Sequence, residues 1–384
     1  MNWILTIFIA AAAAADYAVC RRHLAGRWVL WLLWIADCVP LAMQLAVYLA
    51  GDNTQPWCDA SMRVMLAWML TVVPKTIIFA ALSASRSRWV HAAGAAAAAT
   101  VVVALVCGAV WGRNDLIVNE VEIRSARLPE SFDGFRAAIF SDLHIGSLPD
   151  GEEYIGRVVD AINSTAADAV FFCGDLVNIR HTELDPARMA LLGSIRSRCG
   201  TFSVTGNHDT GHYVADTIAL PADENRRLLL GKERSMGWQP LEGQSIYIRR
   251  GGDSISVTGI PFFDSLREIR HSRRIPQMEI AGAYEGIDSA TFNITLAHIP
   301  QMWPQIRALG RGDVTLSGHV HAMQLKLTLF GLRISPARLQ YRHWSGLYDD
   351  GCGGSLYVND GTGTVGIPVR IGARPEITVI TLRR

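Results

Sequence analysis

The sequence has 384 residues, of which 50% are hydrophobic and 18% are charged, and its net charge is +1. This composition excludes a disordered chain, a collagen-like chain and a small disulfide scaffold, and the near-neutral charge argues against a broad nucleic-acid-binding surface. The charges are unevenly distributed, since residues 1–112 contain 11 of them and residues 113–384 contain the other 60. We therefore expect a membrane domain over residues 1–112 and a globular domain over residues 113–384.

Four apolar stretches follow one another in the first domain. Each is close to the roughly 20 residues with which a helix crosses a bilayer. They predict an all-α four-helix transmembrane domain. The first stretch has no basic residue before it, which favours a retained helix over a cleaved signal peptide. The stretches cover residues 1–20, 28–50, 64–84 and 89–112.

The loops between these stretches differ in their basic residues. The first and third loops together contain five arginines, whereas the second contains one. Basic residues favour the cytoplasmic side of a membrane. We therefore expect a multi-pass protein of the inner or cell membrane, with the second domain outside the cytoplasm. The arginines are Arg21, Arg22 and Arg27, then Arg86 and Arg88, against Arg63 in the second loop.

Two charged residues within the predicted helices, Asp37 and Lys75, would lie at a similar depth in the bilayer. Charges in a bilayer are costly and are usually paired. One hypothesis is that Asp37 and Lys75 are in contact and fix the packing of their helices. The alternative is that Lys75 extends to the membrane surface and Asp37 is protonated.

The seven cysteines show no CxxC spacing, which argues against a zinc ribbon or a redox motif. Cys199 and Cys352 both lie in the second domain. A disulfide between them is a hypothesis that follows only from the extracytoplasmic location expected for that domain.

In the second domain, five apolar runs rich in β-formers each end abruptly in polar residues. The segments between them, such as residues 152–163 and 186–197, favour helices. Functional sites of α/β proteins form where strands end, so we expect the polar residues after these runs to meet. The runs cover residues 136–140, 169–173, 201–204, 291–296 and 313–316.

The residues that follow these runs are of the types that bind metal ions. Asp142 and His144 are two positions apart, which lets both reach one ion if the chain turns instead of continuing as a flat strand. A mixture of nitrogen and oxygen ligands suits Zn, Mn or Fe better than Ca. Two such ions can clamp a phosphate between them. The candidate ligands are Asp142, His144, Asp175, Asn207, His298, His319 and His321.

These blocks resemble, in order, the five motifs of the calcineurin-like metallophosphoesterase superfamily. The resemblance covers residues 120–384 and extends to the membrane-associated bacterial branch with N-terminal transmembrane helices. It implies an αββα sandwich of two mixed β-sheets flanked by helices. At Ala322 and Met323 this chain departs from the two glycines of that branch, which we expect to narrow the cleft or reshape the loop. The blocks are Asp142-Leu-His144, Gly174-Asp175, Gly206-Asn207-His208-Asp209, His298 and Gly318-His319-Val-His321.

The resemblance also implies the roles of the site residues. It implies two divalent or trivalent ions (Mn, Zn or Fe) and direct attack on phosphorus by a hydroxide that bridges them. His208 would contact the phosphate or protonate the leaving oxygen, and Asp209 would orient His208. The alternatives are an electrostatic role for His208 and a turn-capping role for Asp209. One ion would be held by Asp142, His144 and His321, the other by Asn207, His298 and His319, with Asp175 between them.

The expected function is that of a membrane-anchored phosphodiesterase, with a phospholipid or a lipid-linked pyrophosphate among the candidate substrates. The alternatives are a phosphomonoesterase, a nuclease and a non-catalytic metal-binding membrane sensor. The expected partners are a phosphoester substrate and the membrane, without nucleic acid, and the sequence leaves the oligomeric state open. A basic segment is predicted to contact phosphate or lipid headgroups, a solvated loop being the alternative. Its arginines are Arg267, Arg270, Arg273 and Arg274.

Overall fold

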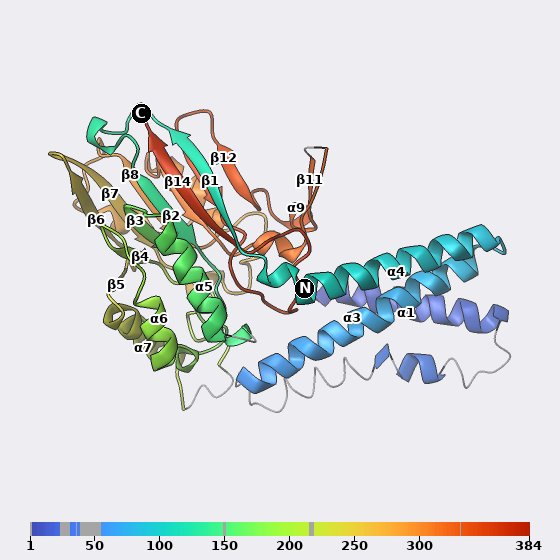
Figure 1. Cartoon of the computed structure of the whole chain (residues 1–384). Coiled ribbons are helices and arrows are strands. Elements are labelled where there is room, and N and C mark those ends of the chain that lie inside the picture. The colour runs from blue at the N-terminus through green and yellow to red at the C-terminus, as the bar shows by residue number, and fades with distance from the viewer. Residues whose placement is uncertain are drawn as a thin grey trace. The chain divides into compact units, whose positions relative to one another are not determined.

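The computed structural model describes residues 2–23, 31–35, 37–38, 55–148, 151–214, 219–330 and 332–384. The chain divides into two compact units. One is Met1–Trp111 with Gly366–Val369, and the other is Gly112–Val365 with Arg370–Arg384. The first unit is helical, and the second contains the β-sheets (Figure 1).

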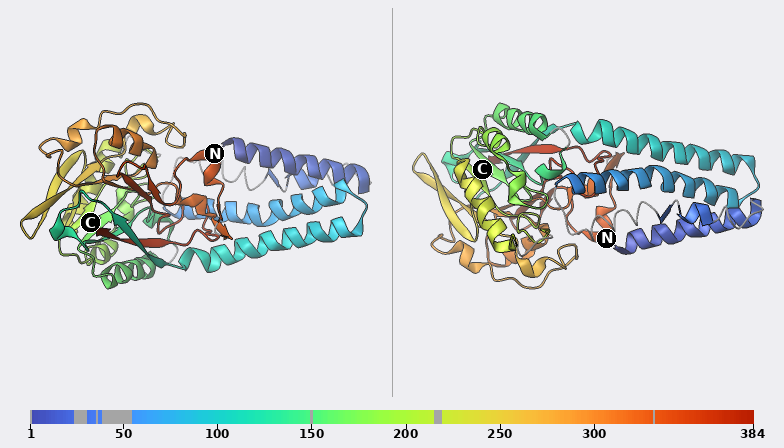
Figure 2. Two further views of the ribbon diagram at one scale, coloured as in Figure 1. Left: turned by 90° about the horizontal axis from the view of Figure 1, so that it is seen from above. Right: turned by 90° about the horizontal axis from the view of Figure 1, so that it is seen from below.

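The helical unit contains α1 (Asn2–His23), α3 (Gln55–Ala84) and α4 (Arg88–Val110). The helix α3 packs beside both α1 and α4 (Figure 2). Within the described residues, Asp59–Ala84 and Arg88–Asn114 are long and apolar enough to cross a membrane. The predicted stretch 28–50 lies mostly outside the described residues, so the four-helix transmembrane domain stays a prediction.

The contact predicted between Asp37 and Lys75 is present, because Nζ of Lys75 pairs with Oδ2 of Asp37. A second carboxylate, Oδ2 of Asp16, lies 2.8 Å from the same Nζ. The sequence did not point to Asp16, since the pairing depends on how α1 is rotated against α3. The single ammonium group thus compensates two carboxylates, which lowers the cost of burying them.

The first sheet of the second unit is buried on both faces, and its sequence shows why. Along β3, Ala169 and Phe171 join one core cluster while Val170 and Phe172 join another. Successive side chains of a strand point to opposite faces, so a continuous apolar run is needed here. In spatial order the strands are β1 (Ile117–Arg124), β14 (Glu376–Arg383), β2 (Arg136–Phe140), β3 (Ala169–Phe172), β4 (Thr201–Ser203) and β5 (Trp238–Pro240).

The second sheet is also mixed, with four parallel strands between two antiparallel edge strands. A separate two-stranded hairpin consists of β10 (Leu327–Leu329) and β11 (Leu332–Ile334). In spatial order the six strands are β12 (Gly346–Asp349), β13 (Ser355–Val358), β9 (Val314–Ser317), β8 (Asn293–Ala297), β7 (Asp253–Ile260) and β6 (Gln244–Arg250).

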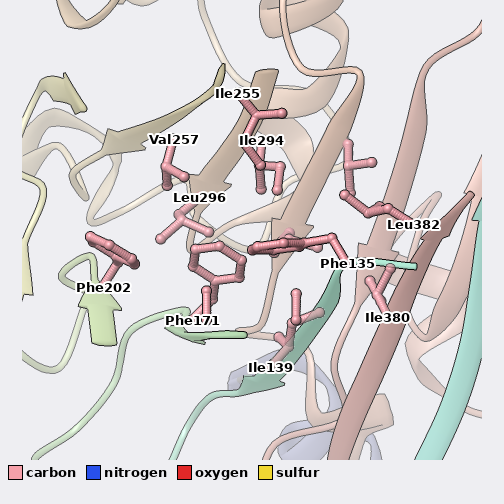
Figure 3. Close-up of a cluster of buried hydrophobic side chains, with 14 of the residues drawn as sticks. Phe135, Ile139, Phe171, Phe202, Ile255, Val257, Ile294, Leu296, Ile380 and Leu382 are labelled. Carbon is pink, nitrogen blue, oxygen red and sulfur yellow. The ribbon is translucent and has the colours of Figure 1, made fainter. Parts of the chain in front are cut away.

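The two sheets pack against each other through a shared apolar cluster, which joins residues such as Phe171 and Ile139 of the first sheet to Ile294 and Leu296 of the second (Figure 3). The outer face of the first sheet is covered by α5 (Gly151–Ser164), α6 (Pro186–Leu192) and α7 (Ala222–Ser235). Against the second sheet lie α8 (Trp303–Ala308) and α9 (Ala337–Gln340). The expectation of two mixed sheets with helices is confirmed.

Two sequence-based expectations were wrong in this unit. The helix predicted over residues 186–197 ends at Leu192, where Gly193 serves as its C-cap. Cys199 and Cys352 are both free. Cys199 precedes β4 of the first sheet, whereas Cys352 lies in the turn between β12 and β13 of the second. The predicted disulfide is therefore not formed.

We expect Ala166→Gly to stabilise the protein. Ala166 follows α5 with a φ of 49°, which is a left-handed backbone conformation. Its side chain is exposed, so no burial offsets the steric cost of that conformation. Glycine removes the steric cost of that backbone, and the free energy of unfolding should rise by about 1 kcal/mol. The matched control is Ala190→Gly in α6, which is exposed and right-handed and should lose about 1 kcal/mol. Urea denaturation measures both changes, and equal signs would contradict the argument.

Candidate metal centre

The seven predicted ligands meet at one edge of the two sheets. They follow the carboxyl ends of five parallel strands, β2, β3, β4, β8 and β9. All seven side chains are buried. Burying so many polar groups is costly unless they are paired or bind a cation. The arrangement is therefore that of a site and not of a sheet edge exposed to solvent.

A first group of donors consists of Asp142, His144 and His321. Oδ1 of Asp142 lies 3.1 Å from Nε2 of His321, and the Nε2 atoms of His144 and His321 are 3.2 Å apart. The carboxylate of Asp142 also accepts the backbone N–H of His319. Three donors from two different sheets are thus directed at one point.

A second group consists of Asp175, His298 and His319. Oδ2 of Asp175 lies 3.2 Å from Nε2 of His298, and Oδ1 of Asn207 lies 3.3 Å from the same nitrogen. Nδ1 of His298 is 2.7 Å from the carbonyl oxygen of Cys173. Since a carbonyl only accepts, Nδ1 carries the hydrogen and Nε2 keeps its lone pair for the site.

The two groups are connected through Asp175. Its Oδ2 is 3.7 Å from Nε2 of His144, which belongs to the first group. Asp175 also forms a group with His144 and His208, and within each group the donor atoms all lie within 4.8 Å of one another. The structure therefore brings the predicted ligands together, with Asp175 in the middle.

The chain turns sharply at most of these donors. Asp142, His144, Asp175, His319 and His321 all have positive φ angles, between 46° and 70°. This left-handed backbone costs on the order of 1 kcal/mol or more for each residue other than glycine. It lets residues two apart, such as Asp142 and His144, direct both side chains into the same site, as the spacing predicts. Strain of this kind typically marks functional sites.

Two glycines allow the carboxylates to approach the backbone closely. A Cβ atom at Gly206 would collide with the carboxylate of Asp175, and one at Gly318 would collide with that of Asp142. Neither glycine is required for a positive φ angle. Their presence in the Gly-Asn-His-Asp and Gly-His-Val-His blocks is therefore explained by space for the ligands.

Residues 135–323 match the family model for calcineurin-like phosphoesterases. The chain contains a calcineurin-like metallophosphoesterase domain. It is 34% identical to a transmembrane protein with metallophosphoesterase domain from Danio rerio, over 70% of this chain and 57% of that protein. It is 28% identical to an uncharacterized metallophosphoesterase of Bacillus subtilis, over 69% of this chain and 84% of that protein. This chain thus spans little more than half of the Danio rerio relative.

Among solved structures, a phosphopantetheinyl hydrolase from Mycobacterium tuberculosis aligns with a TM-score of 0.32 and 14% identity. The alignment covers 53% of this chain and 89% of that chain. A similarity at this level supports no inference about the chemistry of the phosphoesterase domain.

The ionisation of the phosphoesterase site suits a bound cation. Burial alone would raise the pKa of Asp142 and of Asp175, but His321 beside Asp142 and His298 beside Asp175 outweigh it and lower both pKa values. Burial tends to lower the pKa of His298, and the charge of Asp175 raises it instead to about 9. Asp175 thus attracts a positive charge to His298, and a metal ion would take the place of that proton.

Two other imidazoles, those of His144 and His319, supply neutral donors. Burial lowers the pKa of His144 and of His319 well below the ordinary value. A neutral imidazole keeps a lone pair for a metal. Ionised carboxylates and neutral imidazoles whose donor atoms lie within 4.8 Å of one another are the mixed oxygen and nitrogen set that Zn, Mn and Fe prefer. The residues present therefore fit the metal that the family implies.

His208 is positioned differently from the expectation. Its Nδ1 lies 2.6 Å from the carbonyl oxygen of Asn178, which fixes the ring and leaves Nε2 for the site. Its ring also stacks on Tyr213, with the centroids 4.3 Å apart. Asp209 was predicted to orient His208, but its carboxylate accepts four backbone N–H groups. The donors are Asp175, Leu176, Val177 and Gly206. Asp209 therefore fixes the ligand loops, and Asn178 orients His208.

The four arginines of the basic segment reach different places. The guanidinium of Arg270 lies over the ring of Tyr213, 5.8 Å from its centroid, and so faces the site. Arg267 donates to the carbonyl of His212 and lies 3.7 Å from Glu268. Arg273 and Arg274 line a separate cavity. The structure thus brings only Arg270 close to His208.

Sequence reasoning missed two residues that contact histidines among the predicted ligands. Nη2 of Arg370 lies 3.3 Å from Nδ1 of His321, and the hydroxyl of Tyr341 lies 3.4 Å from Nε2 of His319. Arg370 lies in the segment 368–370, well after the last of the five predicted blocks. Tyr341 lies in a segment without any motif, so only the fold shows its position.

Ala322 and Met323, where this chain departs from the two glycines, adopt a backbone conformation that favours glycine. Their φ angles are 47° and 48°, both left-handed. Ala322 is fully buried in a cluster with Val320 and Ala337. The loop after His321 therefore keeps a turn for which glycine is best suited, and the methyl group of Ala322 is accommodated by packing.

Proposed function

We propose that this chain is a membrane-anchored, dinuclear metal-dependent phosphodiesterase. The observation that supports it most strongly is the position of Asp175, within reach of donors from both groups, His144 on one side and His298 on the other. Two groups that share a carboxylate suit a pair of ions. The family match supports a metal-dependent phosphoester hydrolase, and the choice of a diester is the part that we propose.

In this proposal the site residues have three roles, which are metal binding, proton donation and stabilisation of the phosphate charge. Asp142, His144 and His321 would hold one ion, and Asn207, His298 and His319 the other, with Asp175 between them. Bound ions of this kind supply Lewis acidity and a water of lowered pKa. Nε2 of His208 is the ring nitrogen left free for the substrate. In the protonated ring it would donate its proton to the leaving oxygen, while the hydrogen on Nδ1 stays bonded to the carbonyl of Asn178. Arg270 would stabilise the negative charge of the phosphate.

We further propose that the helical unit anchors the enzyme and that the phosphoesterase domain lies outside the cytoplasm. Two candidate spans support the anchoring, and the relative from Danio rerio is named a transmembrane protein. The orientation rests on the arginines of the loops. The substrate would then be a phosphodiester available at the outer face of the membrane, including phospholipids and lipid-linked pyrophosphates.

The test compares the parent protein with Asp175→Asn in bis(p-nitrophenyl) phosphate hydrolysis, with Mn²⁺ or Zn²⁺ and with chelator. Asp175→Asn removes the one charge that both donor groups share, so kcat/KM should fall by at least about 10³-fold. The matched control, Asp133→Asn, changes an exposed carboxylate that pairs with Arg383 and precedes β2, at the end of the strand opposite to the site, and it should leave kcat/KM unchanged.

A phosphomonoester tested in parallel ranks the substrate class. Turnover of the diester well above that of p-nitrophenyl phosphate supports the phosphodiesterase. The reverse order contradicts the diester choice but keeps the hydrolase. Metal-loaded parent protein that cleaves neither compound would contradict the proposed catalytic activity on simple esters and favour the non-catalytic sensor.

A further inference from the structure

A cavity of about 690 Å³ lies beside the candidate metal centre and has a strongly basic lining. One wall carries Arg273 and Arg274, from the loop after β7, and the other carries Arg338 and Arg342, from α9 and the residues after it. No aspartate or glutamate lines this cavity. Among the residues that the structure describes, none of these four guanidinium groups forms an ion pair. Four like charges around one space repel one another unless an anion joins them.

The cavity shares a wall with the metal centre through Tyr341. This side chain lines the cavity, and only 3% of it is exposed. Its hydroxyl lies 3.4 Å from Nε2 of His319, one of the predicted ligands, and 2.5 Å from Nδ1 of His271. The ring of His271 in turn stacks on that of His319, with the centroids 5.2 Å apart. A molecule in the cavity is therefore separated from the metal centre by about one side chain.

The two arginine walls are held in place by backbone contacts. Arg273 donates from Nη2 to the carbonyl of Arg338 at 3.1 Å. Gln340 donates to the carbonyl of His271 at 3.0 Å, and Gln301 donates to the carbonyl of Arg270 at 2.8 Å. The loop after β7 and the segment around α9 are thus joined to each other, and the space between them is formed before any ligand arrives.

We propose that this cavity binds a second phosphate group of the substrate, one that is not hydrolysed. Guanidinium groups match the geometry of phosphate oxygens and donate two hydrogen bonds to them at once. The volume is within the 300–1,000 Å³ typical of small-molecule sites, so it accommodates more than a single phosphate ion. This inference rests on the proposed function, because it assigns the cavity to the substrate of the neighbouring site.

The second phosphate has two chemical sources, a water-soluble compound or a lipid headgroup. The neighbourhood of the cavity contains exposed apolar side chains that would suit acyl chains. Leu339, directly after Arg338, is 77% exposed, and Phe330 at the tip of the β10–β11 hairpin is 98% exposed. Figure 1 shows α9 beside this hairpin. The test therefore uses two probes that carry the same phosphate group with and without acyl chains.

The experiment measures binding of sn-glycerol 3-phosphate and of dihexanoyl phosphatidic acid by calorimetry. It uses the full chain in a non-ionic detergent, with chelator present so that no metal at the neighbouring site holds the phosphate. We compare the parent with Arg273→Gln/Arg274→Gln and with Arg338→Gln/Arg342→Gln, one pair from each wall. The loss of each pair should weaken binding at least about tenfold. The control Arg249→Gln, on the exposed edge strand β6, should bind as the parent does.

Each result has a definite meaning. If the parent binds both probes with equal affinity and both double variants lose this binding, the result supports the subsite and a water-soluble compound as the source of the second phosphate. If the parent binds the lipid more tightly than sn-glycerol 3-phosphate and Leu339→Ser weakens the binding of the lipid, the result supports the subsite and a lipid headgroup as the source of the second phosphate. The proposal is overturned if the parent binds neither probe, or if both double variants bind as tightly as the parent while their thermal unfolding matches it. Binding is measured separately from hydrolysis, so the two proposals can fail separately. A parent that binds phosphate in the cavity but fails the hydrolysis test would contradict the proposed function, and the cavity would remain a phosphate-binding site without a hydrolysed substrate.

Discussion

Replacing Arg370 by methionine is expected to destabilise the phosphoesterase domain by about 3 kcal/mol and to weaken metal binding 10–100-fold. The guanidinium of Arg370 is only 1% exposed. It donates to the backbone carbonyls of Gly363 at 2.8 Å, Ala373 at 3.0 Å and Asp360 at 2.9 Å. Methionine fills a similar volume but leaves these buried carbonyls without a donor, and each such loss costs about 1–3 kcal/mol.

The effect on metal binding has a separate cause. Nη2 of Arg370 also lies beside His321, and Gly361 lies between Arg370 and Asp142. Losing the guanidinium therefore loosens the support of one predicted ligand. Urea denaturation and titration with Mn²⁺ measure the two effects. The control Arg374→Met removes an exposed ion pair with Asp115 and should cost less than about 1 kcal/mol. Equal losses in both variants would contradict a special role for Arg370.

Replacing Glu233 by glutamine is expected to remove a large pH dependence of stability. Glu233 in α7 is 2% exposed, and its carboxyl group accepts a hydrogen bond from the hydroxyl of Ser203. Burial, together with the charges of Asp209 and Glu242, raises its pKa to about 8. The folded protein thus keeps a proton on Glu233 that the unfolded chain releases near its ordinary pKa of 4.5. The folded state binds more protons between these two values, so its stability must fall as the pH rises.

This stabilisation is fully present below about pH 4.5 and is lost as the pH rises through about 8. From pH 5 to pH 9 the loss is on the order of 4 kcal/mol, at about 1.4 kcal/mol for each pH unit. Glutamine stays neutral, so Glu233→Gln should match the parent at pH 5 and exceed it in stability at pH 9. Urea denaturation of both proteins at the two pH values, with chelator present, checks this. A constant difference at both pH values would show that Glu233 is ionised throughout.

Much of the phosphoesterase domain could be predicted because the sequence patterns that indicate its strands and its candidate ligands are short and local. The run Arg136–Phe140 coincides with β2, since a strand buried on both faces has to be apolar at every position. The seven candidate ligands were found in the same way, because each directly follows such a run. The cost of a charge within an apolar helix led to two hypotheses for Asp37 and Lys75, and the structure shows the contact, which was one of them.

The remaining features depend on the three-dimensional arrangement. Asn178 takes the role expected of Asp209, because the loop after β3 brings a carbonyl, and not a carboxylate, to His208. Arg338 and Tyr341 belong to a segment without motif or periodicity. The long loop after β7 contacts both of them, and Tyr341 also contacts His319 of the candidate metal centre. No spacing in the sequence indicates such a meeting.

The left-handed backbone at the five ligand positions links the cation to the dynamics of the loops. Without a cation, this conformational cost is offset only by the burial and the backbone hydrogen bonds of the loops, so the free energy of their local opening is lower than in the metal-bound protein. A metal ion that binds the loops only in their native conformation stabilises that conformation against local opening, by a free energy that grows with the logarithm of the free metal concentration. The amide protons of residues 141–147 and 318–324 should then exchange at rates set by free metal, so that the domain would report metal availability through its own local unfolding.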